Sequence, residues 1–252
     1  MKITFQLLLF FLCLIIPTQA QNNKNKIFCS NSVWMLDDYY NGLMQGKMPM
    51  SLQPQENQIL AVGFNNKSRE LHLLSFHDCL RYKYKLLKRN LVAVLDNQGR
   101  TKCTLELKKI SGMDRLLLNI QGKEMAFLHL PDNYKTIEVV FHFINDHYIT
   151  GSYILRGNEN SRITFSSDGK IKGFREYNEY SISLTKDAVP KDQNILVMKE
   201  IKSFGNGGKK IIKLDYFMWE KNDKNIFLYK LSGPTPNGKI QGKPLELVRT
   251  GS

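Results

Sequence analysis

The chain has 252 residues, 42% of them hydrophobic, and a formal net charge of +13 at pH 7. This hydrophobic content is that of an ordinary folded protein, so we do not expect an intrinsically disordered chain. The positive charge favours anionic partners such as acidic polysaccharides or phospholipids, although the lysines are scattered along the chain. We expect no nucleic-acid binding, because no single element concentrates basic residues with interleaved aromatic ones.

The first twenty residues have the pattern of a secretory signal peptide. Lys2 supplies a positive charge, residues 5–16 (FQLLLFFLCLII) form a short apolar run, and Pro17 ends that run. We expect residues 1–20 to be cleaved near Ala20, which makes the protein secreted, periplasmic or extracellular. No other apolar run is long enough to span a membrane.

Residues 21–58 are predicted to form a polar arm, one short N-terminal helix and a connector. Ser32 can cap a helix over residues 32–44, where apolar side chains recur at helical spacing. Gly46 and Pro49 stop this helix, and the connector follows.

From residue 59 onward the chain has the pattern of an all-β protein. Short runs of Ile, Val, Leu, Phe and Tyr alternate with turn residues, as in antiparallel up-and-down barrels or sandwiches. Two groups of strands predict two small β domains, 59–144 and 145–252; one continuous β structure is the alternative. The first group is expected at 58–64, 69–76, 80–87, 90–96, 101–110, 114–121, 124–130 and 136–144. The second is expected at 147–156, 161–166, 170–175, 178–185, 194–203, 209–219, 224–231 and 244–249.

Residues 151–174 (GSYILRGNENSRITFSSDGKIKGF), with the hairpins after them and the closing KPLELVR at 243–249, resemble a lipocalin-like, or calycin-type, β-barrel. The resemblance covers residues 147–249 and rests on the rhythm of the strands. In such barrels an up-and-down meander encloses one apolar ligand cavity. The resemblance implies a protein that carries or sequesters a small molecule.

The side chains that we expect to contact a ligand are Arg249, Tyr216, Tyr180 and Trp219. Alternation gives one strand an apolar face made of Ile212, Leu214, Tyr216 and Met218. Arg249 shares a face with Leu245 and Leu247, from which its guanidinium would reach a carboxylate or phosphate head group. The alternatives are that Arg249 extends to solvent and that Tyr180 is an ordinary core residue.

The stretch SFHDC at residues 75–79 places a histidine, an aspartate and a cysteine side by side. In an extended chain Asp78 points away from His77 and Cys79, so it cannot orient the imidazole as in a catalytic triad. A hairpin explains the stretch better, with His77 and Asp78 at the tip and Phe76 paired with Cys79.

Signal-peptide cleavage would leave three cysteines, Cys29, Cys79 and Cys103. An odd number in an oxidising compartment predicts one disulfide and one free thiol. Cys79 would reach Cys103 if their strands are neighbours. The other pairings stay open, and the alternative for Cys103 is a buried free thiol.

The sequence contains no Gly-x-Ser-x-Gly, CxxC or HxxxH pattern. His72, His129 and His142 are each expected on the solvent face of a strand. We therefore expect no enzyme, no metal and no cofactor, but a monomer that binds a small apolar or amphipathic molecule. One alternative is an envelope-surface protein that docks on an anionic polymer or a protein partner. Another is a hydrolase whose site is assembled from scattered residues.

Overall fold

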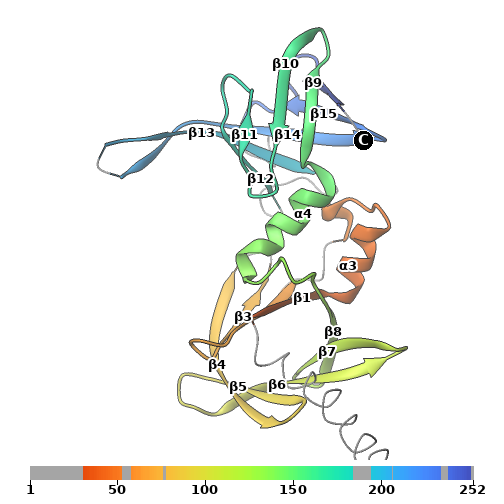
Figure 1. Ribbon diagram of the computed structural model, residues 1–252, viewed down its shortest axis with the longest axis vertical. Coiled ribbons are helices and arrows are strands. Elements are labelled where there is room, and N and C mark those ends of the chain that lie inside the picture. The colour runs from red at the N-terminus through yellow and green to blue at the C-terminus, as the bar shows by residue number, and fades with distance from the viewer. Residues whose placement is uncertain are drawn as a thin grey trace, which may run out of the picture.

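The computed structural model describes residues 31–52, 58–75, 78–183, 194–205, 207–233 and 238–250. Within these ranges the chain forms two barrel-like sheets of eight antiparallel strands each, with two short helices lying between them (Figure 1). The all-β prediction is confirmed. The expected signal peptide and Cys29 lie outside the described residues. No helix of the described part is long and apolar enough to cross a membrane.

The first barrel is closed: each strand pairs with the next one, and the last strand pairs with the first. Alternate side chains fill its interior, and Trp34, Leu71, Leu105 and Phe127 among them are almost completely buried. Its strands are β1 (Ser32–Leu36), β2 (Ala61–Asn65), β3 (Glu70–Leu74), β4 (Cys79–Lys88), β5 (Leu91–Leu95), β6 (Thr101–Ile110), β7 (Met113–Ile120) and β8 (Lys123–His129).

The second sheet is a nearly closed meander of the same kind. Its first and last strands pair, with Tyr153 opposite Arg249, and an isolated bridge between Lys170 and Glu179 links the two ends of the sheet. Aromatic rings pack its interior. Its strands are β9 (Gly151–Leu155), β10 (Asn158–Phe165), β11 (Ile171–Lys172), β12 (Glu179–Ser183), β13 (Ile195–Ser203), β14 (Lys209–Asn222), β15 (Asn225–Lys230) and β16 (Leu245–Arg249).

The prediction of a helix over residues 32–44 is wrong for residues 32–36 and correct for residues 37–44. Ser32–Leu36 form β1, which is hydrogen-bonded to β2 on one side and to β8 on the other, and helix α3 (Asp37–Met44) begins only after it. All five residues of β1 are buried. Pairing on both sides satisfies their backbone groups within the barrel wall, and this tertiary requirement outweighs local helical spacing.

The strand expected at 136–144 is also wrong. This segment is the 3-10 turn η2 (Ile137–Val139) followed by helix α4 (Val140–Tyr148). Its β-branched and aromatic residues are typical of strands. However, Phe141 is 40% exposed and Phe143 only 8%, whereas a strand would place both on one face.

Two further expectations are changed by α4. His142 lies on this helix and not in a strand, and the turn expected at residues 145–148 is the end of the helix. The expected limit between residues 144 and 145 lies inside α4. The helix is therefore the connection between the two sheets.

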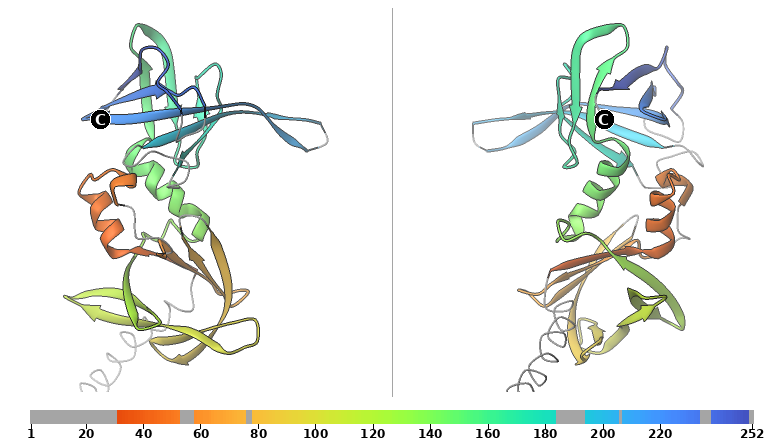
Figure 2. Two further views of the ribbon diagram at one scale, coloured as in Figure 1. Left: turned by 180° about the vertical axis from the view of Figure 1, so that it is seen from behind. Right: turned by 45° about the vertical axis from the view of Figure 1, so that its right-hand side comes forward.

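The helices join the two barrels through direct packing (Figures 1 and 2). Tyr40 of α3 stacks on Phe143 of α4, with ring centres 5.6 Å apart. The ring of Tyr148 lies 5.9 Å from that of Trp219 inside the second barrel, and its hydroxyl donates a hydrogen bond to the carbonyl of Lys47. A 3-10 turn, η1 (Pro49–Leu52), follows α3. One continuous hydrophobic core includes residues of both barrels.

The strands on the two sides of the SFHDC stretch pair as a hairpin, but their register differs by two residues from the expected one. The N–H of Ser75 donates to the carbonyl of Asp78 at 2.8 Å, so Asp78 is paired and is not at the tip as expected. His77, the other residue expected there, lies outside the described residues. Leu74 lies opposite Cys79. The N–H of Asp78 in turn donates to the hydroxyl of Ser75 at 2.9 Å, and this side-chain bond favours the observed register.

The structure does not contain the expected disulfide between Cys79 and Cys103. Both side chains are free thiols. Cys79 begins β4 and Cys103 lies in β6, with β5 between them. Cys103 is opposite Val94, and Val94 is opposite Tyr84, well along β4 from Cys79. Cys103 is buried, as the alternative interpretation expected.

The two phenylalanines of α4 provide a matched test of this packing. Phe143→Ala is expected to lower the free energy of unfolding by about 3–5 kcal/mol, because it leaves a cavity between the helices. Phe141→Ala is expected to change it by less than about 0.5 kcal/mol. Denaturant titration followed by circular dichroism measures both values. Equal losses would contradict the helical placement.

Candidate functional site

Three of the four predicted ligand-contacting residues point toward the interior of the second barrel. Trp219 and Tyr180 are buried there, and Arg249 lies at the rim opposite Tyr153. Tyr216 lies on the outer face, where it packs against a separate small cluster. This cluster consists of Met50, Ile195 and Leu231. The structure therefore brings Arg249 and Trp219 toward one end of the barrel and excludes Tyr216.

The apolar face expected on β14 is its outer face. Phe217 and Trp219 are 1% exposed and fill the barrel, whereas Ile212 and Leu214 are 46% and 42% exposed. Alternation along a strand defines two faces, but it does not show which of them is enclosed.

The enclosed face of β14 also carries charged residues at the end away from the rim. Lys213 pairs with Glu176, and Asp215 pairs with Lys230 at 3.0 Å. The hydroxyl of Tyr177 donates to Asp215 at 2.6 Å. These polar groups have partners of opposite charge, so they close one end of the barrel and require no ligand.

A second cation, Lys221, lies at the rim near Arg249. Lys221 follows Trp219 on the enclosed face of β14 and is opposite Ile226 of β15. Burial, and next the charge of Arg249, lower the pKa of Lys221. The strand register agrees: Ile226 lies opposite both Lys221 and Leu247, and Arg249 follows Leu247 by two residues on the same face. The like charges of Lys221 and Arg249 therefore repel each other. We call Lys221 and Arg249 the cationic rim.

Neither cation of the rim forms an ion pair with an acidic residue in the described part of the chain. Glu246, on the same strand as Arg249, is engaged by Arg156 at 2.9 Å. Arg249 donates instead to the carbonyl of Thr150 at 3.2 Å. Two neighbouring positive charges without an acidic partner are an arrangement that attracts an anion.

Aromatic groups border the cationic rim. The ammonium of Lys221 lies 5.8 Å from the centre of the Tyr148 ring, which in turn contacts Trp219. The indole N–H of Trp219 is buried without a hydrogen-bond partner among the described residues. Tyr148 and Trp219 are only 3% and 1% exposed, so these rings form a buried layer beneath the two cations.

Sequence reasoning missed Lys221 for an identifiable reason. The strand was expected to end at residue 219, which placed Lys221 in a turn, whereas β14 continues to Asn222. Extending the alternation by two residues beyond Trp219 would have placed Lys221 on the same face.

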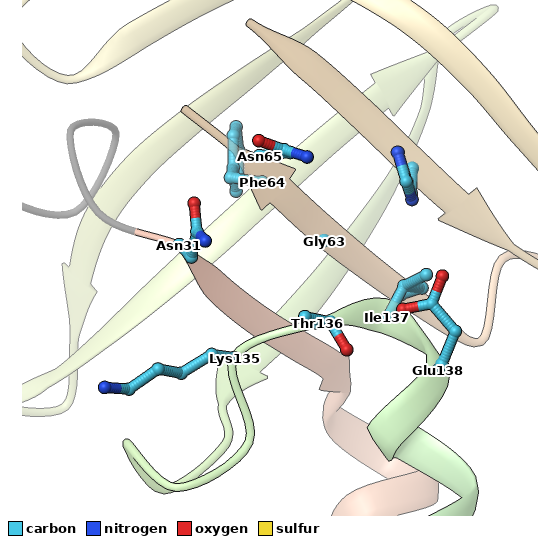
Figure 3. A pocket seen from close by; sticks show the side chains of 9 residues that line it. Asn31, Gly63, Phe64, Asn65, Lys135, Thr136, Ile137 and Glu138 are labelled. Carbon is cyan, nitrogen blue, oxygen red and sulfur yellow. The ribbon is translucent and has the colours of Figure 1, made fainter. Parts of the chain in front are cut away.

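A separate polar pocket of about 110 Å³ lies on the outside of the first barrel (Figure 3). Strands β2 and β3 and the segment leading into η2 form its walls. Gly63 permits this close approach, since a Cβ there would lie 3.1 Å from the Cβ of Ile137. The lining residues are Asn31, Gly63, Phe64, Asn65, His72, Lys135, Thr136, Ile137 and Glu138.

The pocket offers a carboxylate acceptor and an imidazole nitrogen to a small polar ligand. His72 lies on the outer face of β3, but its Nε2 atom is buried and has no hydrogen-bond partner in the described ranges. Burial acts to raise the pKa of Glu138. Hydrogen bonds from its own N–H and from Thr136 outweigh this effect, together with the charges of His72 and Arg81, and the pKa of Glu138 lies below its usual value. Glu138 is therefore ionised. No nucleophile faces His72 within the described lining, so the pocket is suited to binding.

No protein-family model, curated protein or solved structure matches the chain. The fold defines a protein built from two up-and-down β-barrels.

Removal of the Lys221 charge is expected to stabilise the protein. The lowered pKa means that folding disfavours the protonated amine, so the stability contribution of this group rises as pH increases through that pKa. Lys221→Met is expected to raise the melting temperature at pH 7 by about 1–3 °C. Differential scanning calorimetry measures this shift, with the exposed Lys224→Met as the control that should not show it. A lower melting temperature for Lys221→Met would contradict the repulsion at the rim.

Proposed function

We propose that this protein is a secreted, non-enzymatic binding protein of the lipocalin-like kind, which binds a small amphipathic anion at the cationic rim. The observation that carries this proposal is the pair Lys221 and Arg249, held together without an acidic partner in the described chain. Repulsion between them opposes folding, and a bound carboxylate, sulfate or phosphate would relieve it.

The two cations would contribute differently to the anion. The guanidinium of Arg249 is a planar fork that matches two oxygens of a carboxylate or phosphate, whereas the ammonium of Lys221 is a compact charge. The ring of Tyr148 is 3% exposed beneath Lys221, so the apolar part of the ligand would reach it only where the Lys221 side chain moves aside. The resemblance of residues 147–249 to lipocalin-like barrels and the meander order of the strands support this interpretation.

The ligand is expected to bind at the rim and not deep in the barrel, because aromatic rings pack the interior. Phe165 contacts both Tyr153 and Tyr180 edge-to-face, at 5.8 and 5.2 Å. The hydroxyl of Tyr180 donates to the carbonyl of Ser166 at 2.8 Å. Tyr180 therefore acts as a core residue in this proposal.

Laurate binding provides a direct test, because Trp219 borders the rim and the chain has two tryptophans. With Trp34→Phe as the background, laurate is expected to change the emission of Trp219. Lys221→Gln and Arg249→Gln are each expected to weaken binding about tenfold through loss of a charge-assisted bond. Lys224→Gln is the matched control, and a neutral amphiphile with the same alkyl chain should bind weakly to all of them. Equal affinity of every variant for laurate would refute the proposal.

The pH dependence of laurate binding should also identify Lys221. Only its protonated form attracts an anion, so affinity is expected to decline as pH rises through its lowered pKa, below the range in which an ordinary lysine deprotonates. Lys221→Gln should show no such decline, and the two affinities should converge at high pH. Parallel pH profiles for the two proteins would exclude a role for Lys221.

A further inference from the structure

The hairpin formed by β13 and β14 projects from the second barrel in every view (Figures 1 and 2). Strand β12 pairs with β13 only as far as Lys199, and β15 pairs with β14 only from Phe217 onward. Between these points β13 and β14 pair with each other. The side chain of Asn178 hydrogen-bonds to the backbone of Ile201, and Lys213 pairs with Glu176, so the barrel holds the ribbon at these two residues. The described residues from Ile201 to Ile212 form the two-stranded ribbon beyond these contacts, which we call the projecting hairpin.

The projecting hairpin exposes large apolar side chains. Phe204, at its turn, is 50% exposed, and Ile211 is 51% exposed. Ile211 lies opposite Ile201, which places both on one face. Ile212, at the irregularity in the strand register, is 46% exposed. Such a concentration on a narrow ribbon indicates a surface that becomes covered.

The same ribbon is basic. Lys202 lies opposite Lys210, and like charges in that position destabilise a hairpin. Lys209 and Lys210 form no ion pair with an acidic residue in the described part of the chain, whereas Lys202 is paired with Glu200 at 3.3 Å. An anionic surface would neutralise these charges and thereby stabilise the ribbon.

We infer that the projecting hairpin docks this protein on a membrane surface that contains anionic lipids. Phe204 and Ile211 enter the interfacial region, while Lys209 and Lys210 contact lipid phosphates. The charge of the ribbon matches such a surface, and its apolar side chains match the acyl region beneath it. A narrow ribbon provides little area for the roughly 800 Å² per partner of a stable protein interface, whereas a fluid bilayer requires no complementary shape.

This docking surface is independent of the cationic rim. Lys221 lies near the end of β14 that is remote from the projecting hairpin. A failure of one proposal therefore leaves the other intact: hairpin variants should retain laurate affinity, and Lys221→Gln should retain vesicle binding.

Vesicle flotation of the full chain tests the inference. Vesicles of phosphatidylglycerol and phosphatidylcholine are expected to carry the protein, and those of phosphatidylcholine alone to carry much less. Added salt should weaken the binding steeply. Phe204→Ser combined with Ile211→Ser should lower the vesicle affinity about tenfold or more, because two exposed apolar anchors are lost. Lys209→Gln with Lys210→Gln should reduce the preference for phosphatidylglycerol about tenfold.

Matched controls come from β4 of the first barrel. Leu86 and Leu87 are 52% and 49% exposed there, so Leu86→Ser with Leu87→Ser removes comparable apolar surface elsewhere and should leave vesicle binding unchanged. Lys85→Gln with Lys88→Gln removes the same charge and should also have little effect. The inference is overturned if the hairpin variants float as the unmodified protein does, or if the controls lose binding equally. Hairpin-dependent retention on heparin without vesicle binding would assign the surface to an acidic polymer and likewise overturn it.

Discussion

The pairing of β1 with both β2 and β8 is the constraint on which the arrangement of the chain depends. Trp34 lies opposite Val62 on one side and His129 on the other, which closes the first barrel without a free edge. The chain must then leave the wall at the end of β1, so α3 begins at once. Arg115 of β7 donates to Asp37 at 2.5 Å and holds the start of this helix against the barrel. With α3 fixed, α4 packs on it, and Tyr148 reaches the second barrel.

Strand β14 passes through three different environments along its length. Its first residues, up to Ile212, belong to a ribbon in solvent. Phe217 and Trp219 fill the barrel, and Lys221 lies at the rim near its end. On the enclosed face, the charged residues Lys213, Asp215 and Lys221 lie on either side of the buried pair Phe217 and Trp219. This distribution follows from the cost of burying a charge, which is lowest where solvent, a counter-ion or a ligand can reach it.

The two candidate binding sites have opposite electrostatic character. The cationic rim holds Lys221 and Arg249 without a counter-ion in the described chain, which favours an anion. The pocket on the first barrel presents the ionised carboxylate of Glu138 beside the unpaired Nε2 atom of His72. A carboxylate ligand would be repelled by Glu138, so an amphipathic anion discriminates between the two sites through charge alone.

The sequence by itself determined the fold class and the positions of most strands, since alternation and turn residues are local properties of the chain. It also named Arg249 and Trp219 as candidate ligand contacts, although the face it expected to be enclosed on β14 was the opposite one. Only the tertiary structure decided that Ser32–Leu36 is a strand and that α4 is a helix, because their conformations are fixed by partners distant in the sequence. Contacts between residues distant in the sequence also determine which face of β14 is enclosed and bring Lys221 near Arg249. Closure of the barrel sets which side of a strand is inside, and no local pattern contains that information.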